Sequence, residues 1–281
     1  MMHKREFLTA GLGLTAGLIA APGLAAGIQA APAAKPVVPQ RRIRSTVLYK
    51  SPEGFPNALA ASPEGLWIGE QKGPDAVDKS EKAMLVDWKT GKLLRTVVTQ
   101  SRNTSGMAYG GGYIWMGANT SDVEGIFQTD MNSKLVAQRQ IPLGPPGNGG
   151  GTHGAKWHQD KLWIVANRMR GILRVDPKTW EPEFFFPFSF TRWHDIAFDG
   201  NAIWMVTGTS QSIPDNQAGL AKFDAATGKL LETAVFEPGA CDPHGLEIVD
   251  GVFYTCDAGI APGFIDSKSP TSRTINRLDF V

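Results

Sequence analysis

The sequence contains little cysteine and almost no net charge. Only two cysteines occur in 281 residues, and 28 Lys and Arg against 27 Asp and Glu leave a formal net charge of +1. A chain with this balance has no broad charged face for nucleic acid or an anionic membrane. It also lacks a nucleophile elbow, a Cys/His dyad and a dinucleotide-binding fingerprint. We expect a small-molecule substrate as the partner and no nucleic acid, with the chain a monomer.

The first 33 residues are typical of a cleavable export signal. They combine a basic start, a Gly/Ala/Leu-rich stretch and small residues where a signal peptidase cuts. The segment HKREFLTAG resembles a twin-arginine signal with Lys4 in place of the first arginine, which leaves Sec export open. An uncleaved anchor helix is the alternative, but Gly11, Gly17 and Pro22 interrupt the apolar stretch. We expect a periplasmic protein without membrane contact after cleavage, with residues 34–40 as a linker.

The two cysteines are Cys241 and Cys256. An oxidising compartment permits them to pair, and closing a loop of about 15 residues stabilises a protein by about 3 kcal/mol in the chain-entropy description. Two buried free thiols are the alternative. We predict a disulfide between them.

Five segments repeat one order of residue types. Each is typical of two short strands joined by a turn, with an aromatic residue in the second strand. A third strand ending near an aspartate follows in every copy and a fourth strand in four of them, while residues 41–50 supply the strand that the last copy lacks. The repeats are NALAASPEGLWIGEQ, SGMAYGGGYIWMGAN, HGAKWHQDKLWIVAN, HDIAFDGNAIWMVTG and HGLEIVDGVFYTCDA, centred on Trp67, Trp115, Trp163, Trp204 and Tyr254.

Four-stranded units of this length stack radially into a β-propeller. We predict an all-β fold over residues 41–281, a five-bladed β-propeller closed by an N-terminal strand that completes the C-terminal blade. Such closure protects sheet edges that would otherwise be exposed. A β-sandwich is the alternative, but it does not require the same aromatic residue in every second strand.

The residue that opens each repeat is predicted to point toward the mouth of the central tunnel, because the first strand of each propeller blade lines the axis. Three of the five histidines of the chain occupy this position on consecutive repeats, whereas His158 lies in a turn. Structural histidines that only join a hydrogen-bond network, as in WD-type propellers, are the alternative. The five opening residues are Asn57, Ser105, His153, His194 and His244.

The ends of the second strands are predicted to converge on the same mouth, where they supply carboxylate and amide groups. They carry Glu70, Asn119, Asn167 and Asp257. Imidazoles with carboxylates suit a metal cation, and imidazole can instead act as a general base while carboxylates hold Ca or Mg. We predict a divalent metal ion, which could be Zn, Mn, Fe, Ca or Mg, with the ligand set His153, His194, His244, Glu70 and Asp257.

The remaining site residues are predicted from their place beside the histidines. Arg192 is expected to clamp a substrate carboxylate, and Trp193 to stack on a ring. The catalytic residues are predicted to be His194, His244 and Arg192. The predicted substrate-binding residues are Asn57, Ser105, Asn119, Asn167, Arg168 and Trp193.

The segments DPHGLEIVDGVFYTCDAG and FPNALAASPEGLWIGEQ, with the Asp-x-x-Thr-Gly-Lys hairpins, resemble the superfamily of streptogramin lyases and gluconolactonase-type propellers. The resemblance covers roughly residues 45–281 as a repeat pattern. It implies a lactone-opening elimination by a histidine and a carboxylate with a divalent metal, for which His244 with Glu70 or Asp257 is the nearest match. The chain departs from the family in its five repeats, rather than six or seven blades, and in its richer set of histidines.

Together these features predict a metal-dependent lyase or a lactone or ester hydrolase. The metal would polarise a carbonyl group while an imidazole moves the proton. Two other functions remain open, a redox enzyme with histidine-ligated Fe or Cu and a non-enzymatic binding or scaffold propeller. The architecture alone does not decide among them, because propellers host many chemistries.

Overall fold

Every regular element of the described chain is a β-strand. The computed structural model describes residues 38–72, 76–118, 125–142, 151–188, 193–208, 218–261, 264–265 and 271–281, which belong to one unit, Val38–Val281. The predicted signal and most of the predicted linker lie outside these residues. No helix among the described residues has the length and apolar character needed to cross a membrane.

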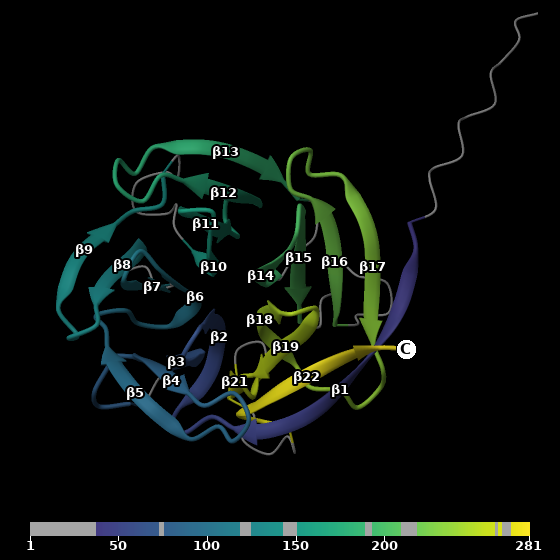
Figure 1. Ribbon diagram of the computed structural model, residues 1–281, viewed down its shortest axis with the longest axis horizontal. Helices are drawn as coiled ribbons and strands as arrows, with labels where there is room; N and C mark the ends of the chain where they lie inside the picture. Colours follow the sequence, from purple (N-terminus) through teal and green to yellow (C-terminus); the bar gives the residue numbers. More distant parts are fainter. Residues whose placement is uncertain are drawn as a thin grey trace, which may run out of the picture. The chain divides into compact units, whose positions relative to one another are not determined.

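Three consecutive four-stranded antiparallel sheets follow the first described strand along the chain, and Figure 1 shows them arranged around a common centre. The first consists of β2 (Phe55–Ser62), β3 (Gly65–Gln71), β4 (Lys82–Val86) and β5 (Leu93–Val98). The second consists of β6 (Thr104–Gly110), β7 (Tyr113–Ala118), β8 (Gly125–Asp130) and β9 (Leu135–Arg139). The third consists of β10 (Thr152–His158), β11 (Lys161–Ala166), β12 (Gly171–Val175) and β13 (Pro182–Pro187).

The remaining long strands form one eight-stranded sheet in the order β14, β15, β16, β17, β1, β22, β19, β18. Its strands are β14 (Trp193–Asp199), β15 (Ala202–Thr207), β16 (Gly219–Asp224), β17 (Leu230–Phe236), β1 (Gln40–Lys50), β22 (Thr274–Phe280), β19 (Val252–Asp257) and β18 (Pro243–Val249). A separate short pair joins β20 (Ile260–Ala261) to β21 (Phe264–Ile265).

Strand β1 closes the ring from the other end of the sequence, as predicted. It pairs antiparallel with β22, where Arg44 is opposite Asp279, and parallel with β17, where Arg42 is opposite Val235. In Figure 1, β1 runs along the outer side of β17 and then along β22, and in the sheet order it stands between these two strands. Both edges of β1 are therefore used, and the sheets on its two sides are joined into one.

The tight turns after the third strands are built by aspartate, as the sequence predicts. The carboxylate of Asp87 accepts hydrogen bonds from the backbone N–H groups of Lys89 and Thr90 at 3.2 and 2.9 Å, and Asp224 repeats the arrangement. These bonds satisfy donors that the turn leaves unpaired. An aspartate thus stands at the end of the third strand in both repeats and holds the turn that leads to the fourth strand.

Hydrophobic clusters fill the spaces between neighbouring sheets. The repeated tryptophans lie in these spaces; Trp67, Trp115 and Trp204 are each at most 2% exposed. Trp67 stacks on Tyr109 of the next inner strand, with ring centroids 5.7 Å apart, and Trp115 stacks on Trp157 in the same way at 5.9 Å. Large aromatic side chains contribute much of the hydrophobic stabilisation in such a core. The repeat pattern is therefore explained by contacts between sheets.

The inner strands approach one another closely around the axis. They make contacts in a closed cycle, β2 with β6, β6 with β10, β10 with β14, β14 with β18 and β18 with β2. A Cβ on Gly106 would lie 2.6 Å from the backbone of Gly154, and one on Gly154 would lie 2.7 Å from the carbonyl oxygen of His194. Glycine is required at both positions because no larger residue fits between the strands. The opening residues of the inner strands are consequently held near one another.

Candidate active site at the histidine end of the inner strands

Each inner strand carries a register irregularity at the residue that opens its repeat. In β10 the pairing with β11 shifts between Thr152 and Gly154, on either side of His153, and in β14 it shifts between Trp193 and Asp195, on either side of His194. The other inner strands shift in the same way around Asn57, Ser105 and the His244–Gly245 pair. A bulge inserts an extra residue into a strand and redirects its side chain. The bulges therefore remove the five opening residues from the regular alternation of the sheets.

The three histidines lie side by side. The ring centroids of His153 and His194 are 5.6 Å apart, and those of His194 and His244 are 4.1 Å apart. His194 and His244 are buried, at 5% and 3% exposure, while His153 is partly exposed. We call these three side chains the histidine cluster. The predicted adjacency of imidazoles from three different repeats is found in the structure.

The other two opening residues continue this arc. The side-chain amide of Asn57 donates to the carbonyl oxygen of Thr104 at 2.8 Å and to the hydroxyl of Ser105 at 3.4 Å. It also donates to Gln71 at 2.8 Å. Asn57 and Ser105 are both buried. Asn57 therefore ties β2 to β6. The sequence predicted it to bind substrate and did not reveal this structural role.

A carboxylate that the sequence reading missed contacts the cluster. Nε2 of His244 lies 3.2 Å from Oδ2 of Asp242, two residues earlier in the chain. Asp242 is in turn held by its backbone N–H, which donates to Asp257 at 3.1 Å. A carboxylate bonded to one imidazole nitrogen fixes the orientation and tautomer of the ring. The Asp-Pro-His order of the segment was the available signal for this pair.

The two carboxylates predicted as metal ligands serve the backbone. Asp257 is 1% exposed and accepts hydrogen bonds from the N–H groups of Gly259 and Asp242 and from the hydroxyl of Thr271, at 2.7, 3.1 and 2.7 Å. Glu70 is 3% exposed and accepts the N–H of Lys82 at 3.1 Å. Burial raises the pKa of both carboxyl groups above their usual values. These contacts brace the loops around the second strands.

The predicted ligand set does not fit a metal ion as these side chains are placed. Zinc, for example, requires imidazole nitrogens at about 2.0–2.1 Å from one point. Within the described residues, no group of three or more His, Cys, Asp or Glu side chains is arranged to hold a metal. Asp257 and Glu70 are already engaged by backbone donors.

The predicted substrate-binding residues divide into three groups. Trp193, which we predicted to stack on a substrate ring, is 1% exposed and instead packs against Phe188 and Phe223 in the core. Asn167 donates to the carbonyl oxygen of Trp193 at 2.8 Å, and Arg168 is exposed. Asn119, predicted to bind substrate, and Arg192, predicted to be catalytic, lie outside the described residues.

The predicted disulfide is not formed. Cys241 and Cys256 are both free and buried. The sulfur of Cys256 accepts the N–H of Gly245 at 3.1 Å, next to His244. Burial raises the pKa of Cys241 to about 12 and that of Cys256 well above its usual value, so both remain thiols. The alternative of two buried thiols describes this structure.

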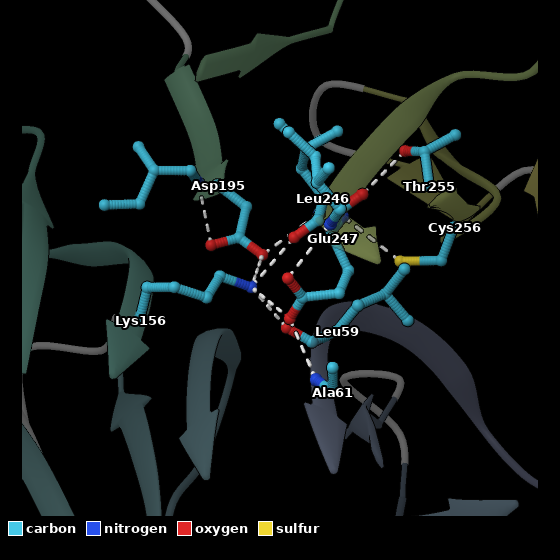
Figure 2. A network of polar contacts seen from close by, with 11 residues as sticks. Leu59, Ala61, Lys156, Asp195, Leu246, Glu247, Thr255 and Cys256 are labelled. Carbon is cyan, nitrogen blue, oxygen red and sulfur yellow. Dashed lines mark hydrogen bonds and ion pairs between the residues drawn. The ribbon is translucent and has the colours of Figure 1, made fainter. Parts of the chain in front are cut away.

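A buried charged group on the axis was also missed. The ammonium of Lys156 contacts the carbonyl oxygens of Leu59 and Leu246 at 2.5 and 2.8 Å, and the carboxylates of Asp195 and Glu247 at 3.4 Å each. Figure 2 shows these groups converging from different strands. We call Lys156, Asp195 and Glu247 the lysine network. Its three side chains are at most 9% exposed.

Electrostatics within the lysine network follow from burial and pairing. Burial disfavours the charged ammonium of Lys156, but the two carboxylates outweigh it and raise its pKa. Burial raises the pKa of Asp195 to about 7, although Lys156 opposes this. Asp195 also accepts the N–H of Leu246 at 3.0 Å and so ties β14 to β18. The strands that carry His194 and His244 are thereby fixed to each other below the histidine cluster.

Comparisons with known proteins support the fold. A scan against protein-family models finds no match, and no curated protein sequence matches the chain. Among solved structures, glutaminyl cyclase from Myxococcus xanthus is similar with a TM-score of 0.59 and 11% identity, over 86% of this chain and 99% of that one. Virginiamycin B lyase from Staphylococcus aureus is similar with a TM-score of 0.47 and 16% identity, over 82% and 68%.

The glutaminyl cyclase structure is only 11% identical to this chain, so the similarity shows the fold alone. The chain is an all-β protein of the β-propeller type, and a streptogramin lyase is among the solved structures that it resembles.

Proposed function

We propose that the protein is an enzyme that performs general acid–base chemistry on a small organic molecule at the histidine cluster. The reaction class is elimination or the hydrolysis of a lactone or ester, as the sequence predicts. The observation that carries this proposal is the contact of three imidazoles from separate strands, one of which is bonded to the carboxylate of Asp242. Histidines that only stabilise the structure should recur in every repeat, whereas here three of the five repeats have one at this position.

The division of labour follows from the hydrogen bonds of His244. When Nε2–H donates to Asp242, Nδ1 holds the lone pair that can accept a proton. Nδ1 of His244 is buried and has no hydrogen-bond partner among the described residues. In an elimination, Nδ1 would take the proton next to the carbonyl group; in hydrolysis, it would take a proton from the attacking water. The Asp242 carboxylate would stabilise the imidazolium that results.

His194 is the natural second group, because its ring lies 4.1 Å from that of His244. It would donate a proton to the leaving oxygen, so that one imidazole gains a proton while its neighbour loses one. His153, more exposed than the other two, would contact the substrate at the entrance.

The architecture and location that we propose with this function are a five-bladed ring and export to the periplasm with loss of residues 1–33. Five hydrophobic clusters between neighbouring sheets support the blade count when the eight-stranded sheet is divided at the β17–β1 pairing. Export is supported by the composition of the first 33 residues.

The test compares purified variants on a panel of small lactones, esters and elimination substrates. The panel includes a glutaminyl peptide because glutaminyl cyclase is among the proteins of similar structure. We expect His244→Ala to lower kcat by about 10²–10⁴-fold and Asp242→Asn to lower it by at least about tenfold. His158→Ala is the matched control, since His158 stacks on Phe198, away from the cluster. Its kcat should stay within about twofold of the parent.

The alternatives give different results in the same experiment. A binding or scaffold propeller would show no turnover on any substrate, and equal activity of His244→Ala and the parent would also refute the proposal. A redox enzyme would consume oxygen and contain stoichiometric Fe or Cu. Elemental analysis of the preparation tests the predicted divalent metal directly.

A further inference from the structure

A cavity lies at the opposite ends of the inner strands from the histidine cluster. It has a volume of about 220 Å³. The histidines stand near the first residues of β10, β14 and β18, whereas the residues that line this cavity stand near the last residues of the same strands. We call it the axial cavity. Its lining residues are Ala60, Ala61, Tyr109, Lys156, Trp157, His158, Phe198, Gly200, Glu247 and Ile248.

Aromatic residues from three consecutive inner strands form one part of the wall. Tyr109, Trp157 and Phe198 each follow the opening residue of their repeat by four positions, on β6, β10 and β14. All three are only partly buried and line the cavity. The ring of His158 is parallel to that of Phe198, with centroids 3.8 Å apart, and extends this wall. Aromatic faces carry negative electrostatic potential and attract cations.

The carboxylate of Glu247 forms the charged part of the wall. Its Oε2 accepts the N–H of Ala61 at 2.9 Å and contacts Lys156, and its Oε1 accepts the N–H of Ile248 at 3.0 Å. A carboxylate offers about four lone-pair positions. Donors from the described part of the chain occupy three of them, which leaves one position for a further donor.

The nearby ammonium does not make the cavity attractive to anions. Nζ of Lys156 contacts two carbonyl oxygens and two carboxylates, which exceeds its three N–H donors. The positive charge of Lys156 is therefore already matched within the lysine network. An anion would meet aromatic faces and the Glu247 carboxylate, while a neutral apolar molecule would leave that carboxylate desolvated without any gain.

We propose that the axial cavity is a second ligand site, for a small organic cation of the alkylammonium class. The cation contacts the rings of Tyr109, Trp157 and Phe198, and Glu247 supplies the opposite charge. The volume is below the 300–1,000 Å³ of usual drug-sized sites, so the ligand is small. This site is separate from the histidine cluster and does not depend on the function proposed for it.

The experiment uses choline and its neutral carbon isostere, 3,3-dimethylbutan-1-ol, as a matched pair of probes. Binding is measured by calorimetry and by the indole N–H signals of the tryptophans in NMR spectra of the full protein. We expect choline to bind at least about tenfold more tightly than the isostere, because only choline carries the charge. Equal binding of the two, or no binding of choline up to about 50 mM, would overturn the proposal.

Variants locate the binding. Glu247→Gln should weaken choline binding at least about tenfold, and Phe198→Leu should weaken it severalfold while leaving Glu247 in place. Glu232→Gln is the matched control, because Glu232 lies on the outer strand β17 in an ion pair with Arg41. Unchanged binding in both cavity variants would place choline elsewhere and refute the assignment. The Phe198 variant and the probe pair keep the test decisive if Glu247→Gln does not fold.

Discussion

Replacing Lys156 by methionine is predicted to destabilise the protein strongly. The ammonium contacts two main-chain carbonyls and two carboxylates, and its side chain is 5% exposed. Methionine has similar length but no charge, so Asp195 and Glu247 lose their counter-charge in a buried space. Breaking a buried ion pair by removing one partner costs about 3–5 kcal/mol. We expect a loss in that range at pH 8.

The loss should depend on pH. Burial raises the pKa of Asp195 to about 7 even with the lysine present. Below pH 7 this carboxyl group is protonated, and one of the two charges that methionine would strand is absent. The destabilisation by Lys156→Met should therefore be smaller at pH 6 than at pH 8, which unfolding in urea followed by tryptophan fluorescence would measure.

Lys161→Met is the matched control. Lys161 pairs with Asp176 and Glu183, and its side chain is 28% exposed. Water screens such pairs, so the destabilisation by Lys161→Met should be much smaller than that by Lys156→Met. A further variant, with Lys156→Met, Asp195→Asn and Glu247→Gln combined, should recover part of the loss because no uncompensated charge remains. Equal destabilisation by the two lysine variants would refute the role assigned to the lysine network.

Three further predictions follow from burial and close packing. The folded state holds a proton on Asp195 up to about pH 7, whereas the unfolded chain releases it near pH 3.8. The free energy of unfolding should therefore fall as pH rises from about 4 to 7. In urea titrations Asp195→Asn should show a flatter dependence on pH than the parent protein. Gly154→Ala should cost about 1–3 kcal/mol, since its Cβ would overlap the neighbouring inner strand, and an unchanged Tm would show that the strands can separate. Reductant should leave Tm unchanged, and Cys241 and Cys256 should react with iodoacetamide only on unfolding, because both are buried thiols; rapid labelling of the native protein would contradict this.

The repeat pattern predicted the all-β architecture because it depends on local periodicity. Each tryptophan packs between sheets, and each turn aspartate bonds its own hairpin, so neighbouring residues contain the necessary information. The adjacency of the histidines was also predictable, since equivalent positions in a ring face the same axis. The bulges that redirect these positions were not visible in the sequence.

The lysine network could not be predicted in detail, because its contacts join strands far apart in the chain. Lys156 and Glu247 occupy one repeat position, three residues after the opening histidines, where the other repeats have alanine. A lysine in one repeat and a glutamate in another, at a position that is otherwise alanine, indicate an ion pair near the axis of the ring. The backbone donors to Glu70 and Asp257 could not be predicted for a similar reason, since they depend on how the segments after the second strands and before β18 fold.

The pairing of β1 with β22 has a consequence for how the molecule reaches its native state. The two strands belong to opposite ends of the described unit, so the last sheet is completed only when the two ends of the chain find each other. Contacts of such long sequence separation are slow to form. A nascent or truncated chain that ends before residue 274 retains two unpaired edges, and these are places where chaperones or proteases would distinguish incomplete molecules from finished ones.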